Sequence, residues 1–185
     1  MKCCISPIQQ PKAFLKLIDN KAPIMLVDSH CHLNFPEFEN DLEQVIENAR
    51  QQGVTTLLTV NTRLNEVSRL KQIAEHYTDV FFSVGVHPHV AVDYFKTPLL
   101  KDLKELATHP KAIGIGETGL DYHYNNSPSS QQIHCFEQHL QASIDLDLPI
   151  IIHTREADQD TLACLDRYPG AKGVFHCFSG STALA

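Results

Sequence analysis

The chain has 185 residues, 43% of them hydrophobic and 20% charged, which is the composition of an ordinary globular domain. Its formal net charge of −7 excludes a general positive surface for a polyanion, so any contact with nucleic acid has to be local. The sequence contains no apolar stretch of membrane-spanning length, no recognisable signal peptide and no CxxC pair among its six cysteines, so we expect a cytoplasmic protein with reduced thiols.

The predicted elements begin after an N-terminal extension, residues 1–23, in which prolines and polar residues follow no regular pattern. In residues 24–185, short β-branched runs alternate with segments of helical periodicity, which is typical of βα units and a parallel sheet. The predicted strands cover 24–28, 54–60, 80–86, 112–116, 149–153 and 173–176. The predicted helices cover 39–52, 64–76, 98–108, 130–146 and 157–168.

Such an α/β pattern fits either an open doubly wound sheet or a closed barrel. Candidate metal ligands follow the first, fourth, fifth and sixth predicted strands. Side chains from so many strand ends converge at the C-terminal rim of a barrel but would splay apart in an open sheet. We therefore expect a TIM-type (β/α)8 barrel that is incomplete, because only six βα units are recognisable and the last two are missing.

The candidate ligands are four histidines and one glutamate. His30 and His32 stand two positions apart in extended backbone, so both can face one ion. Glu117 follows the small residues of the fourth strand, and His153 and His176 end the fifth and sixth. A single histidine of this kind is more often structural than a ligand. Because imidazoles and carboxylates at matching strand ends suit divalent ions, the five together predict a binuclear metal centre.

The strings VDSHCHL, VGVHPH, IGETGLDY, IIHTRE and FHCFSG resemble, in this order, the successive strand-end motifs of the TatD family of metal-dependent hydrolases. The resemblance covers the chain from residue 24 to residue 180. It implies that His30, His32 and Glu117 hold one metal ion and that Glu117, His153 and His176 hold the second. The implied ions are two magnesium ions, with zinc or manganese as alternatives.

The resemblance also implies the reaction, which is hydrolysis of phosphodiester bonds in DNA by a 3′–5′ exonuclease that acts on single-stranded or frayed ends. Glu117 would bridge the metals, and His87 would lie near the substrate phosphate as a second catalytic residue. Arg155 is a candidate phosphate clamp, and Tyr122 and His123 are candidate base contacts in the loop after the fourth strand. Exposed ion pairing and loop packing are the alternative interpretations of these three residues.

The chain departs from the family pattern in one respect, because no residue matches the aspartate that the family places after the eighth strand as ligand and general base. An inactive metal-binding fragment is therefore one alternative. Hydrolysis of an amide, lactone or aminoacyl ester is another, since a metal-activated hydroxide can also attack a carbonyl. The missing units would leave open sheet edges that favour self-association, although no defined oligomer is predicted.

Several side chains near these motifs receive weaker predictions. His89 is a candidate neighbour of the metal ligands, and His139 is expected to be solvated on its helix. Cys31 and Cys177 are expected to be buried thiols, because neighbouring residues on a strand point to opposite faces.

Overall fold

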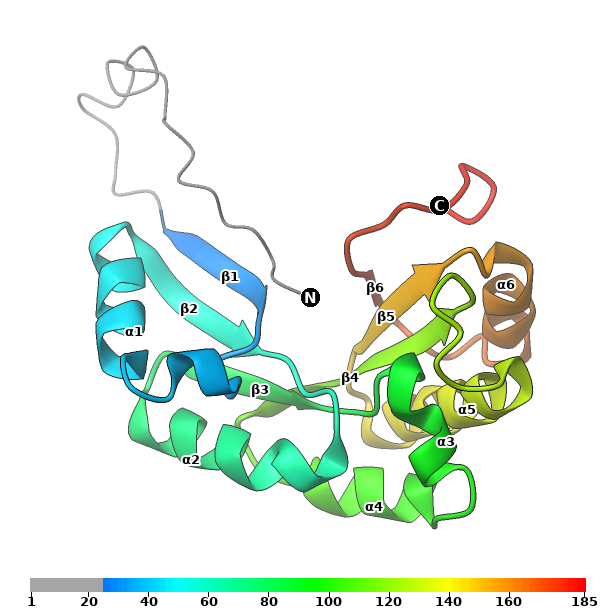
Figure 1. Ribbon diagram of the computed structural model, residues 1–185, viewed down its shortest axis with the longest axis horizontal. Coiled ribbons are helices and arrows are strands. Elements are labelled where there is room, and N and C mark those ends of the chain that lie inside the picture. Colours follow the sequence, from blue (N-terminus) through cyan, green and yellow to red (C-terminus); the bar gives the residue numbers. More distant parts are fainter. Residues whose placement is uncertain (1–24) are drawn as a thin grey trace.

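The computed structural model describes residues 25–185, so the predicted N-terminal extension lies outside the described residues. Six parallel strands form one sheet in the order β1-β2-β3-β4-β5-β6, and each strand therefore lies beside the next one in the chain. The sheet curls into an open half-barrel, and the helices cover its outer, convex side (Figure 1). The expected fold class, a (β/α)8 barrel represented by six units, is confirmed.

Every predicted strand and helix is present. The strands are β1 (Leu26–Cys31), β2 (Val54–Thr59), β3 (Val80–Val84), β4 (Ala112–Asp121), β5 (Ile150–Arg155) and β6 (Gly173–Phe175). The helices are α1 (Leu42–Gln51), α2 (Val67–His76), α3 (Ala91–Tyr94), α4 (Leu99–Leu106), α5 (Ser129–Leu146) and α6 (Asp158–Arg167). Single 3₁₀ turns precede α1, α2 and α3, and the last of these turns, η4 (Pro88–Val90), lies at the mouth of the site described below.

The outer helices bury one apolar stripe against the sheet. In α1, Ile46 is fully buried, and Gly53 follows the helix with a φ of 89°, a conformation that glycine adopts without steric cost. α5 is different, because it packs against both α4 and β4 and buries polar as well as apolar side chains. The prediction that His139 is solvated is wrong, since this α5 residue has no exposed surface.

The core has two parts that meet at β4. The larger cluster joins β2, β3 and the first half of β4 to α1, α2 and α4, with Phe82, Leu70 and Leu103 fully buried. The smaller cluster joins the second half of β4 and β5 to α5 and α6 around Phe136 and Leu140. β4 is therefore held on both sides along its whole length, which makes it a rigid base for side chains at its C-terminal end.

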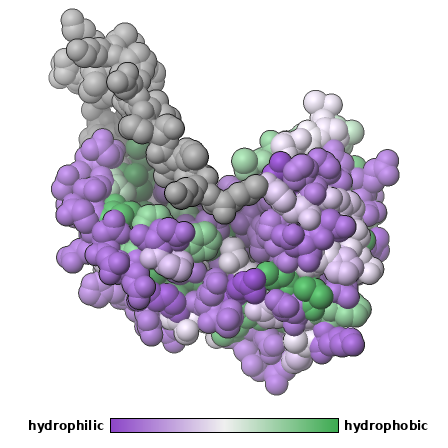
Figure 2. All heavy atoms as spheres, in the orientation of Figure 1, coloured by the Kyte–Doolittle hydropathy of each residue, from purple (hydrophilic) through white to green (hydrophobic). Residues whose placement is uncertain are grey.

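The concave side and the outer strands keep apolar residues exposed. Met25, Val27 and Val174 are 75%, 62% and 59% exposed. Figure 2 shows apolar surface next to β1 and β2, between the hydrophilic surfaces of the outer helices. No helix in residues 25–185 combines the length and apolar character needed to cross a bilayer.

Candidate metal centre

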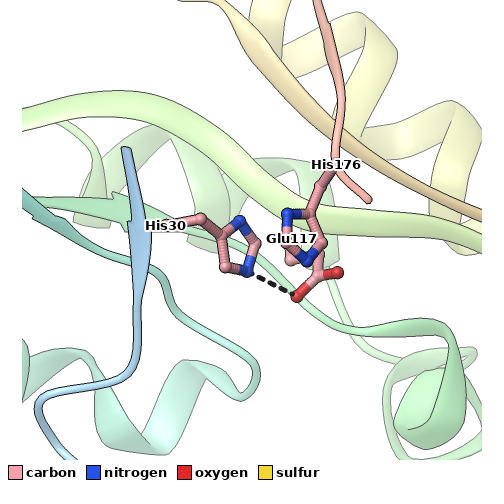
Figure 3. Close-up of side chains that lie close together, drawn as sticks. All are labelled: His30, Glu117 and His176. Carbon is pink, nitrogen blue, oxygen red and sulfur yellow. Dashed lines mark ion pairs between the residues drawn. The ribbon is translucent and has the colours of Figure 1, made fainter. Parts of the chain in front are cut away.

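Glu117 is the centre of the candidate site. It lies on β4, is only 4% exposed, and is surrounded by imidazole rings. His30 Nε2 lies 3.4 Å from Glu117 Oε2, and His153 Nδ1 lies 3.2 Å from Glu117 Oε1. Figure 3 shows His30, Glu117 and His176 pointing toward one another from β1, β4 and the segment after β6. Side chains from the two edges of the sheet thus meet above its middle.

The donor atoms form two groups that share this carboxylate. One group is His30, Glu117 and His176, the other is His87, Glu117 and His153, and within each group the donor atoms lie within 4.8 Å of one another. The carboxylate oxygens divide the groups, because Oε2 faces His30 and Oε1 faces His153 and His87. A carboxylate with one oxygen toward each group of imidazoles has the donor chemistry required to bridge two divalent ions.

Glu117 is ionised at this position. Burial alone would raise its pKa, but the hydrogen-bonded imidazoles of His153 and His30 hold the pKa of Glu117 far below its ordinary range. Burial acts against the imidazolium form of His153, yet the carboxylates of Glu117 and Asp121 outweigh it and raise the pKa of His153. The site therefore attracts positive charge within an acidic protein.

His176 and His30 lie side by side, although the resemblance assigns them to different metal ions. Their rings stack with centroids 3.4 Å apart and an interplanar angle of 12°. The resemblance pairs His176 with His153, whereas the structure brings His176 to His30 and places His87 beside His153. The structure thus brings the side chains of His30, Glu117, His153 and His176 together, and the proximity of their donor atoms differs from the pairing that the resemblance implies.

His32 lies next to this cluster but outside both groups. Its ring centroid is 5.1 Å from that of His30, and the ring also stacks on Phe35 at 4.7 Å. Its Nδ1 is 2.9 Å from the carbonyl oxygen of Val60, which can only accept, so Nδ1 carries the proton. In the neutral ring, Nε2 then keeps its lone pair for a metal ion, and burial followed by the charge of His30 lowers the pKa of His32 and favours this form.

Asp121 is a site residue that the sequence reasoning missed. It ends β4, is fully buried, and its Oδ2 accepts hydrogen bonds from His89 Nε2 at 2.9 Å and from His153 Nε2 at 3.0 Å. Because Nε2 of His153 donates to Asp121, Nδ1, which donates to Glu117 here, is the atom that would give up its proton to bind a metal ion. The signal was available, because Glu117 and Asp121 stand four positions apart on one strand and therefore on one face.

His87 belongs to the second donor group, and its side chain is 14% exposed. Its Nδ1 accepts the backbone N–H of His89 at 3.3 Å, so in the neutral ring Nε2 carries the proton and faces Glu117 Oε1 at 3.9 Å. Burial lowers the pKa of His87 to about 3, which keeps the ring neutral near pH 7. An adjoining pocket of about 320 Å³ is lined by His32, Phe35, Thr62, Arg63, His87, His89, Val90 and Glu117.

The other three expected substrate contacts lie in a second group around the β4–α5 loop. Arg155 places its guanidinium 4.9 Å from the centroid of the Tyr124 ring, and His123 Nδ1 lies 2.8 Å from Glu156 Oε1. The hydroxyl of Tyr122 donates to Asp160 at 2.6 Å, which ties this side chain to α6. Arg155 and Tyr122 line a pocket of about 640 Å³ with residues 179–181.

The two cysteines near the ligands differ in their surroundings. Cys31 is half-buried, and its thiol donates to the carbonyl oxygen of Leu58 at 3.3 Å. Burial, followed by the charge of Asp28, raises the pKa of Cys31 to about 12, so the thiol stays protonated. The expectation of burial is wrong for Cys177, which is exposed in the segment after β6.

Comparison with known proteins places this geometry in a family. The model described as TatD related DNase matches residues 27–185. The chain belongs to the TatD family. The YjjV protein of Escherichia coli K12, a TatD homologue of known crystal structure, superposes on this TatD chain with a TM-score of 0.78 and 29% identity, over 86% of the chain and 62% of YjjV.

Curated TatD relatives carry hydrolase names. YabD of Bacillus subtilis strain 168, named an uncharacterized metal-dependent hydrolase, is 37% identical over 87% of this chain and 64% of its own length. A protein of Cronobacter turicensis named 3′-5′ ssDNA/RNA exonuclease TatD is 34% identical over 84% of this chain and 60% of its own length. The chain thus spans less than two thirds of the length of these TatD relatives.

Proposed function

We propose that this TatD chain provides the metal-binding part of a hydrolase that cleaves phosphodiester bonds of DNA from the 3′ end of a single strand. The observation that carries the proposal is the buried carboxylate of Glu117, which is shared by two groups of imidazoles. Further support comes from the exonuclease name of the relative from Cronobacter turicensis. Hydrolysis of a cyclic amide or another carbonyl substrate is the competing reaction of such a donor set.

The ligand roles follow from the donor atoms. We propose that His30, His32 and His176 hold one divalent ion, that His153 holds the other, and that Glu117 bridges them. When bound, two such ions polarise a phosphoryl oxygen, lower the pKa of a water and stabilise the leaving oxygen. Four imidazoles and one carboxylate favour zinc over the magnesium that the resemblance implies.

Residues of the chain itself would orient the substrate. His87 is neutral, and its Nε2 proton points toward Glu117. It can therefore donate a hydrogen bond to a phosphate oxygen without adding a positive charge that would repel the metal ions. Arg63 lines the same pocket and pairs with Asp93 at 3.3 Å, an exchangeable partner for a second phosphate. Arg155, Tyr122 and His123 would contact the nucleotide further from the scissile bond.

The first test divides one preparation of the chain into samples loaded with manganese, zinc or magnesium. Each sample is assayed on a single-stranded oligonucleotide and on cyclic amides. Stepwise shortening of a 5′-labelled single-stranded oligonucleotide, abolished by a chelator, is the expected result. Cleavage of cyclic amides without cleavage of DNA would instead support the carbonyl hydrolase. Metal binding without any hydrolysis would support the metal-binding fragment.

The second test removes the bridge. Glu117→Gln replaces an ionised oxygen by an amide nitrogen that cannot bind a cation, so we expect the number of metal ions bound per chain to fall and hydrolysis to be lost. Elemental analysis of dialysed protein measures the first effect. Glu105→Gln on α4, a position that is 65% exposed, is the matched control and should leave both unchanged. An unaltered metal content in Glu117→Gln would contradict the ligand assignment.

A further inference from the structure

His139 is a buried histidine that has no place in the metal centre. It lies on the side of α5 that faces the sheet and has no exposed surface. Its Nδ1 is 2.7 Å from the carbonyl oxygen of Cys135, one turn earlier in the same helix. Its Nε2 accepts the backbone N–H of Val86 at 2.9 Å, just beyond the end of β3. The ring therefore joins a helix to the strand end that leads into His87.

These two hydrogen bonds require a single protonation state. The carbonyl of Cys135 can only accept, so Nδ1 must carry a proton, and the amide of Val86 can only donate, so Nε2 must not. Only the neutral Nδ1–H form of His139 satisfies both partners. Burial lowers the pKa of this histidine to about 4, so this form is the one present near neutral pH.

The three residues after β3, which we name the β3 strap (residues 85–87), depend on such contacts because the regular strand ends at residue 84. Each amide of the strap has a different acceptor. The amide of Gly85 donates to Asn61 Oδ1 at 3.1 Å, that of Val86 to His139, and that of His87 to the carbonyl oxygen of Thr62 at 3.0 Å. The bond to His139 is the one among these three that ties the strap to a helix.

The strap lies directly against the residue before the bridging carboxylate. A Cβ atom on Gly85 would lie 2.5 Å from the backbone of Gly116, a separation that no side chain tolerates. Two positions further on, His87 Nε2 lies 3.9 Å from Glu117 Oε1. Because Val86 and His87 are adjacent in the chain, a displacement of Val86 would also shift the His87 ring relative to Glu117, which β4 holds in place.

We infer that His139 is a positioning residue, which holds the β3 strap through the Val86 amide and thereby fixes the His87 ring beside Glu117. Its relevance to catalysis rests on the proposed function, but the positioning itself does not. A misplacement of a substrate-contacting group by about 1 Å can reduce a rate on the order of a hundredfold. A buried side chain on a helix behind the sheet would thus set the geometry of the site.

The hydrogen bond can be tested without any enzymatic activity. Two nitrogens joined by an N–H···N bond show a scalar coupling, so ¹⁵N-labelled protein should show one between the Val86 amide and His139 Nε2. Absence of this coupling in the folded wild-type chain would overturn the inference.

Two matched amide variants test the positioning. The oxygen of His139→Gln reaches the place of Nε2 and can accept from Val86, whereas the shorter side chain of His139→Asn reaches only the place of Nδ1. The imidazole ¹⁵N shifts of His87, at fixed pH and without metal, should stay as in the wild type in the first variant and change in the second. Equal shifts in both would overturn the inference. If His139→Asn does not fold, His139→Phe, which offers no acceptor, replaces it.

A double-mutant cycle then tests the effect on hydrolysis. With the metal content unchanged, His139→Asn should lower kcat on the order of a hundredfold, and His139→Gln should restore it. In a His87→Ala background the same change should have no further effect, because the path through His87 has already been removed. An equal loss in both backgrounds would show a merely structural role. If the wild-type chain cleaves no DNA, the proposed function fails, while the resonance measurements still decide on the positioning.

Discussion

At the level of a single residue, Asp121 orients the His153 ring in the candidate metal centre. The carboxylate accepts from Nε2 of both His89 and His153, and it also accepts the backbone N–H of Tyr124 at 2.9 Å. Burial would raise the pKa of Asp121, but these three donors outweigh it and lower that pKa. A fixed, ionised acceptor at this place keeps the His153 ring in one orientation.

Replacement of Asp121 should therefore weaken metal binding although Asp121 itself belongs to neither donor group. We expect Asp121→Asn to reduce the affinity for the divalent ion by about ten- to hundredfold, as is usual when the outer partner of a ligating histidine is lost. Competition with a chromophoric chelator measures the affinity. Asp145→Asn on α5, which removes the pair with Lys104, is the control and should change nothing. An affinity equal to that of the wild type would rule out this orienting role.

His139 should also make the stability of the fold depend on pH. The pKa of His139 is 6.5 in the unfolded chain and about 4 in the folded chain, so between these pH values the unfolded state binds more protons. The free energy of unfolding should fall by about 3 kcal/mol as the pH drops through this window, and no further below it. Urea unfolding of wild type and His139→Phe at pH 7 and pH 5 isolates this contribution. Identical pH dependence in both proteins would contradict it.

At the scale of elements, Lys111, the residue just before β4, caps the C-terminal end of α2. Its Nζ donates to the carbonyl oxygens of Ala74 and Tyr77, each at 2.6 Å. Carbonyls at a helix end lack intrahelical partners and carry partial negative charge. We expect Lys111→Met to lower the free energy of unfolding by about 1–3 kcal/mol. In contrast, Lys101→Met, at a side chain that is 72% exposed, should have almost no effect. Chemical denaturation of both variants checks this.

The elements also show what the sequence could and could not predict. The periodicity of apolar residues located all six strands and the main helices, but it ended the fourth strand at residue 116, where apolar residues give way to Glu117. β4 continues to Asp121 because residues 118–121 pair with 152–155 of β5 and because the site residues satisfy its polar side chains. Local pattern carries no information about such a pairing.

α5 illustrates the same limit for burial. Its sequence mixes polar and apolar residues, and a histidine on such a helix is expected to lie in solvent, whereas His139 is buried. The helix is packed on more than one side, and Gln132 is buried as well, with its amide donating to the carbonyl oxygens of Asp121 and Ser127. Polar residues with partners elsewhere in the fold look, in the sequence, like surface residues.

At the scale of the whole molecule, the half-barrel leaves both outer strands with one neighbour each within the described sheet. Val27 on β1 and Val174 on β6 are exposed there, and unpaired strands with apolar side chains associate readily. We expect concentration-dependent self-association of the chain in analytical ultracentrifugation, reduced by the double change Val27→Lys and Val174→Lys. Val92→Lys on α3, away from the sheet edges, is the control and should not reduce it. A wild-type chain that stays monomeric at all concentrations would contradict this.

The stacked rings of His30 and His176 connect β1 with the segment directly after β6, at the two outer ends of the described sheet. A divalent ion bound by both imidazoles would cross-link, through their side chains, two segments that are far apart in the sequence. Like a disulfide, such a cross-link lowers the conformational entropy of the unfolded chain and thereby stabilises the folded state. The ion that the site is proposed to bind would thus also hold the two outer ends of the open half-barrel together.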